Sequence, residues 1–79
     1  MNPLQEAIEE YRAATAELAK RVAAKKIGAA IGTALGASAT LWRSDTQIDG
    51  MTLAEIEAWV DEVEAADIAW PEEGDGAPV

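Results

Sequence analysis

The first third of the chain repeats one face of a helix at alternating steps of four and three residues. The positions in this seam are Leu4, Ile8, Tyr11, Thr15, Leu18 and Val22. Asn2 and Pro3 supply an N-cap and a proline at the first helical position. The pattern predicts a long helix from Pro3, with a kink or a fresh helix near Lys26, because the seam meets a lysine at position 25.

Residues 27–42 carry no charge and contain two stripes with a spacing of four. Ile27, Ile31 and Leu35 form one stripe, and Gly28, Gly32 and Gly36 form the other. On a helix, the glycine stripe would let another backbone approach closely. A membrane span needs about 20 apolar residues. This run is shorter and includes Gly, Thr and Ser, so it predicts a buried helix in a soluble core.

Residues 39–49 lose the helical period and leave two structures open. One is a short β-hairpin that pairs Leu41 with Ile48, and the other is an irregular loop. The stretch DTQIDG, 45–50, partly matches a calcium loop, but Gln47 and Ile56 stand where the third and twelfth positions need oxygen ligands. We therefore expect a plain turn there and no bound metal.

Thr52 and Glu55 form a capping box that opens a last helix, which we expect to end near residue 66. Its apolar positions are Leu53, Ile56, Trp59, Val60 and Val63. The other side carries two rows of acids: Glu57, Asp61 and Glu64 in one, Glu55 and Glu62 in the other. Trp42 and Trp59 are expected in the core, whereas Trp70 is the best candidate for an exposed contact.

These elements predict a mainly α fold: a small helical bundle of two to three helices, with the hairpin or loop at 39–49. Residues 1–70 form a single small domain, and residues 71–79, rich in Pro, Gly and acids, form a flexible tail. A chain of 79 residues has few bulky side chains for its core. Its stability is therefore expected to be marginal, and a homo-oligomer is possible.

The chain has neither cysteine nor histidine. These absences exclude disulfides, thiolate metal sites, and every nucleophile that is activated by histidine. Paired carboxylates could catalyse a reaction only inside a cleft, for which a chain of this size has little material. We expect a protein that is not an enzyme and needs no cofactor.

The formal net charge is −9, and residues 45–75 hold eleven acids and no base. Such a surface repels nucleic acid and anionic membranes and attracts basic protein surfaces. We therefore expect a basic protein partner, with no direct nucleic-acid binding and no membrane. The candidate contacts are the acids of the last helix and its flanks together with one tryptophan: Glu55, Glu57, Asp61, Glu62, Glu64, Asp45, Asp49 and Trp70.

In size, charge and the absence of Cys and His, the chain resembles small phage-encoded inhibitors, notably anti-CRISPR proteins. The likeness covers residues 45–75 and implies a non-enzymatic inhibitor that occupies the nucleic-acid-binding surface of a host complex. Residues 39–60 are similar in layout to helix–hairpin–helix modules of phage tail-fibre assembly proteins, which implies a structural adaptor.

The adaptor would act through an apolar interface made by the glycine stripe and the first helical seam. A small membrane-associated protein is a third alternative. Acids occupy the start of the chain, where a signal peptide needs bases, so we expect a cytoplasmic location, that of the host if the chain is phage-encoded.

Overall fold

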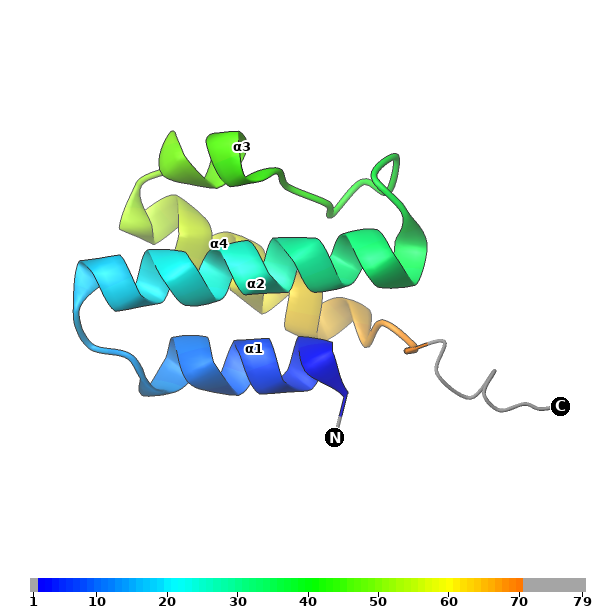
Figure 1. Cartoon of the computed structure of the whole chain (residues 1–79), viewed down its shortest axis with the longest axis horizontal. Coiled ribbons are helices and arrows are strands. Elements are labelled where there is room, and N and C mark those ends of the chain that lie inside the picture. Colours follow the sequence, from blue (N-terminus) through cyan, green and yellow to red (C-terminus); the bar gives the residue numbers. More distant parts are fainter. Residues whose placement is uncertain (1, 71–79) are drawn as a thin grey trace, which may run out of the picture.

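The computed structural model describes residues 2–70, which hold four helices and no strand. α1 (Pro3–Ala13) and α2 (Glu17–Leu35) run antiparallel and side by side, and α4 (Leu53–Ala66) crosses behind them (Figure 1). The short α3 (Asp45–Asp49) lies above α2. The mainly helical bundle is thus confirmed, with one short helix more than expected. The predicted tail, 71–79, lies outside the described residues.

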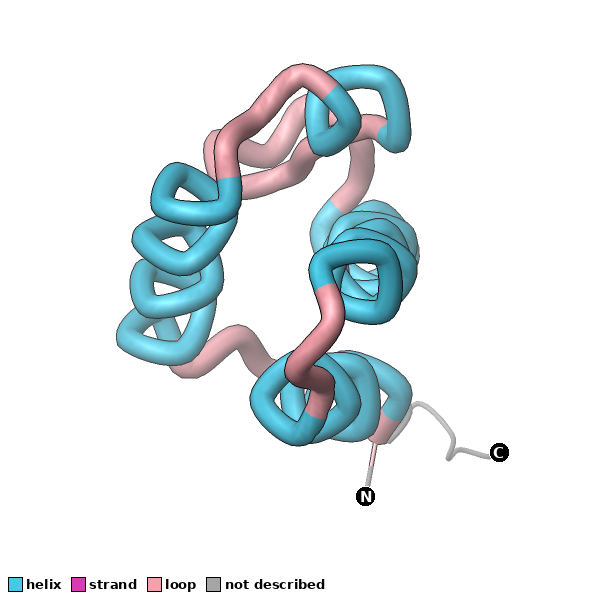
Figure 2. Tube along the Cα trace, turned by 90° about the vertical axis from the view of Figure 1, so that its left-hand side faces the viewer, coloured by secondary structure: helices cyan, strands magenta, loops and turns pink. Residues whose placement is uncertain are grey.

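Figure 2 shows α4 on one side of the molecule and α1 and α2 on the other. The buried hydrophobic side chains form one cluster with members from all four helices. Each fully buried Leu, Ile or Val contributes about 1.5–3 kcal/mol to folding. Alanines between these larger side chains let α1 and α2 pack closely. The buried members are Leu4, Ala7, Ile8, Tyr11, Ala23, Ala24, Ile27, Ala30, Ile31, Ile48, Ile56, Trp59, Val60 and Val63.

The predicted long first helix is wrong, because the chain reverses at residues 14–16. Ala14 and Ala16 have extended backbone angles, and no side chain caps the start of α2. The second half of the seam therefore faces solvent, with Leu18 76% and Val22 43% exposed. The reversal has a physical reason: it brings Ile27 and Ile31 against α1, where one straight helix would hold them apart.

The expected kink near Lys26 is also absent, since α2 is a single helix from Glu17 to Leu35. Its buried positions are Ala23, Ala24, Ile27, Gly28, Ala30 and Ile31, which share one face. Lys25 and Lys26 lie outside that face. Lys25 therefore breaks the apolar pattern without breaking the helix.

Neither a hairpin nor a continuous irregular loop occupies residues 39–49. Gly36, with φ +95°, ends α2, and a turn and a short loop lead to α3. Ser44 and Gln47 cap α3 reciprocally: the Ser44 hydroxyl accepts from the Gln47 N–H at 3.1 Å, and the Gln47 side chain accepts from the Ser44 N–H at 2.8 Å. This is the capping-box spacing, and it gives residues 45–49 a helical start.

Two glycines of the stripe, Gly28 and Gly32, pack inside the molecule, whereas a Cβ at Gly36 would meet no atom within 4 Å. A Cβ at Gly28 would lie 2.5 Å from the Arg43 carbonyl oxygen, and a Cβ at Gly32 would lie 2.9 Å from Trp42 Nε1. The loop after α2 thus folds back onto the surface that these glycines leave open. Trp59 of α4 holds the same loop, because its Nε1 donates to the Leu41 carbonyl at 2.7 Å.

The last helix agrees with its prediction. Thr52 and Glu55 form the expected capping box, with the two hydrogen bonds at 3.1 and 2.8 Å. The helix ends at Ala66, and Asp67 follows in the left-handed conformation with φ 50°. Trp59 is buried as expected, whereas Trp42 is half-buried against the cluster.

Candidate functional site

The acids of α4 fall into two groups: those that pair with Arg12 of α1 and those that do not. Glu57, Asp61 and Glu64 converge on Arg12, which lies near the end of α1. Arg12 Nη2 lies 2.8 Å from Asp61 Oδ1, and the same guanidinium also pairs with Glu57 and Glu64. These carboxylates, Glu64 and Asp61 foremost, raise the pKa of Arg12. The cluster of one guanidinium and three carboxylates retains two negative charges.

Tyr11 adds a hydrogen bond to this contact between α1 and α4 from the side of the core. Tyr11 is 1% exposed, and its hydroxyl donates to Glu57 Oε1 at 2.9 Å. Burial, the hydrogen bond to Glu57 and the negative charge of that carboxylate raise the pKa of Tyr11 to about 12. Lys20 Nζ lies 4.4 Å above the same ring and donates to the Tyr11 carbonyl at 3.3 Å. Glu57 is therefore bound from two sides, by Tyr11 and by Arg12.

The second row of α4 stays open. Glu55 and Glu62 are exposed and form no ion pair with a described residue. Glu55 uses one oxygen to cap its own helix and still projects its charge. These two acids are the part of the predicted surface on α4 that no described base offsets.

The acids of α3 differ from each other in the same way. Asp49 pairs with Lys25 of α2, with Nζ 2.9 Å from Oδ1. Asp45 is exposed at the first turn of α3 and has no ion-pair partner among residues 2–70. The spacing of Asp45 and Asp49 partly matches a calcium-binding loop, but both residues lie in the short helix α3. Residues 2–70 contain no group of three or more His, Cys, Asp or Glu arranged to hold a metal ion.

The bases are all engaged within the molecule. Arg12, Arg21, Lys25 and Lys26 pair with acids. Lys20 and Arg43 bond to main-chain carbonyls, and Arg21 also donates to the carbonyls of Ile48 and Met51. Six acids of the described part have no such ion pair: Glu6, Glu9, Asp45, Glu55, Glu62 and Asp67.

Trp70 lies apart from the acidic rows. It is half-buried against the core cluster and lines a groove between α1 and α2, together with Ala7, Lys26 and Ala30. The groove has a volume of about 470 Å³. Trp70 thus presents part of its ring at the surface and uses the rest for packing.

The sequence pattern did not identify Arg12 as the centre of the acidic surface. Its position beside Tyr11 showed that it borders the buried face of α1, but only the reversal at residues 14–16 decides which helix it meets. Among residues 2–70, no helix has the length and apolar character to cross a bilayer. Comparison of the chain with family models, curated proteins and solved structures found no match.

Proposed function

We propose that this protein is a non-enzymatic acidic inhibitor of the phage-encoded, anti-CRISPR-like kind. It occupies a basic surface with which a host protein complex binds nucleic acid, and it acts in the host cytoplasm. Its contact surface is the open side of α4, with Glu55 and Glu62, extended by Asp45 of α3. The Arg12 cluster adds its two excess negative charges.

The observation that supports this proposal is an imbalance in pairing: the bases are bonded within the molecule, and half of the acids in the described part are not paired. Every base among residues 2–70 already bonds to an acid or a carbonyl, whereas six acids have no ion pair there. The negative field therefore extends outward and attracts a basic surface. Glu55 and Glu62 lie seven positions apart on the same side of a rigid helix, and so they hold their charges at a fixed interval, as a nucleic-acid backbone does.

The test uses the partner that this protein captures from host lysate at low salt. The captured complex is purified, loaded with labelled nucleic acid, and titrated with the inhibitor while fluorescence polarisation is followed. We expect displacement of the nucleic acid, and weaker displacement at high salt, because the Debye length falls from about 8 Å at 0.15 M to about 3 Å at 1 M.

A matched pair of variants locates the surface. Glu55→Gln with Glu62→Gln removes two charges from α4 and keeps an oxygen to cap the helix. Glu6→Gln with Glu9→Gln removes the same charge from two acids of α1 that also have no ion pair among residues 2–70. The first pair should weaken displacement and the second should not. Displacement that is equal in both variants, or independent of salt, would show that the acids of α4 are not the contact.

A structural adaptor remains the competing proposal, favoured by one observation. Leu18 and Val22 lie one turn apart on the outer side of α2, and both are exposed. The glycine half of the interface expected for an adaptor is not free, since Arg43 and Trp42 cover Gly28 and Gly32. An adaptor would therefore use the Leu18–Val22 surface alone.

Sedimentation velocity separates the two proposals. An adaptor that assembles through apolar contacts should form an oligomer that persists at high salt and that Leu18→Asn with Val22→Asn disrupts. Since both side chains are exposed, this change should alter the stability of the monomer by less than about 0.5 kcal/mol. A monomer at all salt concentrations, with or without the substitutions, counts against self-assembly through this surface.

A further inference from the structure

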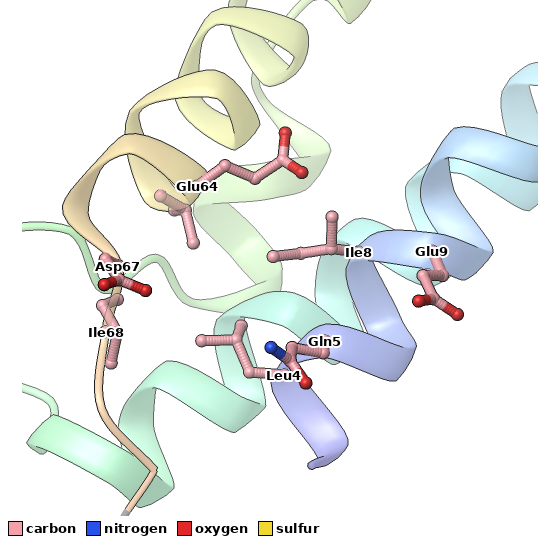
Figure 3. Close-up of a pocket in the computed structure, with 8 residues that line it drawn as sticks. Leu4, Gln5, Ile8, Glu9, Glu64, Asp67 and Ile68 are labelled. Atoms are coloured by element: carbon pink, nitrogen blue, oxygen red, sulfur yellow. The ribbon is translucent and has the colours of Figure 1, made fainter. Parts of the chain in front are cut away.

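The groove between the first turns of α1 and the end of α4 has almost no free apolar floor (Figure 3). Leu4 and Ile8, which line it, are only 4% and 9% exposed. Glu64 on its border already pairs with Arg12. The groove therefore offers a ligand little surface, and the reactive position of the molecule lies elsewhere, at the end of α3.

The last residue of α3 is Asp49, and Gly50 follows it. In such a pair the glycine nitrogen can bond to the carboxyl carbon of the aspartate side chain. One carboxylate oxygen then leaves as water, taking the proton of that nitrogen and one proton from solvent. The succinimide that forms is hydrolysed when water adds to the main-chain carbonyl carbon. The bond from that carbon to nitrogen breaks, the nitrogen regains a proton, and one proton returns to solvent. The chain afterwards runs through the side chain as isoaspartate, with mass and net charge unchanged.

The surroundings of this pair leave the reaction sterically open. The Asp49 side chain is 58% exposed, so water reaches it. A Cβ at Gly50 would meet no atom nearer than 3.6 Å, and the glycine itself has no side chain that hinders its nitrogen. α3 has five residues, of which only Ile48 is buried. A helix this short is marginal by itself, so α3 depends on a few contacts.

In the closed helix, these contacts keep the reacting atoms apart. The Gly50 N–H donates to the carbonyls of Thr46 and Gln47 at 3.2 and 3.1 Å. Lys25 Nζ holds the carboxylate of Asp49, 2.9 Å from Oδ1. The succinimide ring also requires Cβ and the next nitrogen to be eclipsed about the Cα–C bond, which lies outside helical backbone angles. The reaction therefore requires α3 to open first.

We propose that Asp49 is a site of isoaspartate formation whose rate is set by local opening of α3. The capping box of Ser44 and Gln47 and the ion pair with Lys25 hold the helix closed. Each opening frees the Gly50 nitrogen, and only the open fraction reacts. The product adds one carbon to the main chain between α3 and α4 and moves the carboxylate that Lys25 holds. This proposal does not depend on the proposed function.

The experiment follows isoaspartate during incubation of the whole protein at neutral pH. Trypsin and a glutamate-specific protease release residues 44–55, and Asp75, which also precedes a glycine, falls in a different fragment. Chromatography separates the two forms, and labelling by an isoaspartate methyltransferase identifies the product. A synthetic peptide of residues 44–55 gives the rate without the fold. We expect the protein to react about tenfold or more slowly than the peptide, because opening breaks the capping box and the ion pair.

Three variants test what holds α3 closed. Ser44→Ala removes the N-cap and should speed the reaction about fivefold, whereas the same change in the peptide should have no effect. Lys25→Gln should speed it about twofold. Lys26→Gln is the matched control, since Lys26 pairs with Glu10 of α1, and it should leave the rate unchanged. Unchanged helical circular dichroism shows that each variant is folded.

Urea distinguishes local opening from unfolding of the whole chain. Opening of α3 exposes little surface, so the rate should rise with urea less steeply than the equilibrium constant of global unfolding. A rate that follows global unfolding refutes control by α3. Three other results also overturn the proposal: equal rates in protein and peptide, no isoaspartate at position 49 in the Ser44→Ala protein, or equal acceleration by Lys25→Gln and Lys26→Gln.

Discussion

Replacing Gly28 by alanine tests whether the glycine stripe is an internal packing surface. The added Cβ would lie 2.5 Å from the Arg43 carbonyl oxygen and 3.3 Å from Ile48 Cδ1. The first of these atoms is main chain and cannot turn aside as a flexible side chain can. Leu41, two residues earlier, is also held by Trp59. The loop would therefore have to move away from α2.

Two opposing effects set the size of the change. Alanine in place of glycine inside a helix gains about 1 kcal/mol in propensity. Overpacking a close contact costs about 1–3 kcal/mol, and the steric overlap here is at the severe end. We expect Gly28→Ala to lower the free energy of unfolding by about 1–2 kcal/mol. For a domain of this size, the midpoint of thermal unfolding falls by about 4–8 °C for each kcal/mol.

The assay is urea unfolding followed by circular dichroism, with two other glycines as controls. A Cβ at Gly50 would have no atom closer than 3.6 Å, so Gly50→Ala should leave the stability unchanged or raise it. Gly32→Ala should fall between the two, because it meets the ring of Trp42, a side chain that can shift. A Gly28→Ala protein as stable as the parent would refute the packing of the 42–43 loop on α2.

The remaining predictions concern the α1–α4 junction and the helix caps. Arg12→Gln should lower the free energy of unfolding by about 1 kcal/mol at low salt and by less at high salt, because three like charges then face one another; it should also tighten binding to a basic partner. The absorbance titration of Tyr11, the sole tyrosine, should give a pKa near 12 rather than 10, and Glu57→Gln should bring it down. Since the pKa of Tyr11 is higher in the folded state, the stability that this group contributes is complete below pH 10 and is lost as the pH rises toward 12. Ser44→Ala and Thr52→Ala should each cost about 1 kcal/mol through the lost N-cap, as measured by urea unfolding.

The parts of the fold that depend on local signals could be predicted from the sequence. The capping box at Thr52, the apolar face that contains Trp59, and the helix end near residue 66 all follow from spacing within a few turns. The same spacing occurs at Ser44 and Gln47 and starts α3, although Thr40, Leu41 and Trp42 just before it favour a strand. A capping-box pattern is thus a stronger signal than a short β-branched or aromatic run.

The reversal at residues 14–16 has no local signal. Alanine is the best helix former, and neither glycine nor proline marks the turn. The break is decided by the tertiary gain of bringing Ile27 and Ile31 of α2 into one buried cluster with Leu4 and Ile8 of α1. Spacing within one segment does not contain this information. The position of Arg12 among the acids of α4 depends on the same reversal. The sequence could therefore predict which acids are candidates for the surface. It could not predict which of them pair with a base and which have no ion pair.

The internal engagement of every base has a consequence for how the molecule behaves at high concentration. Two copies that meet each carry a formal net charge of −9 and therefore repel each other, and each lysine and arginine already has a partner in its own chain. This repulsion should keep the chains apart as the protein concentration rises, and more strongly at low than at high ionic strength. A small protein with this charge is expected to stay dispersed at high concentration.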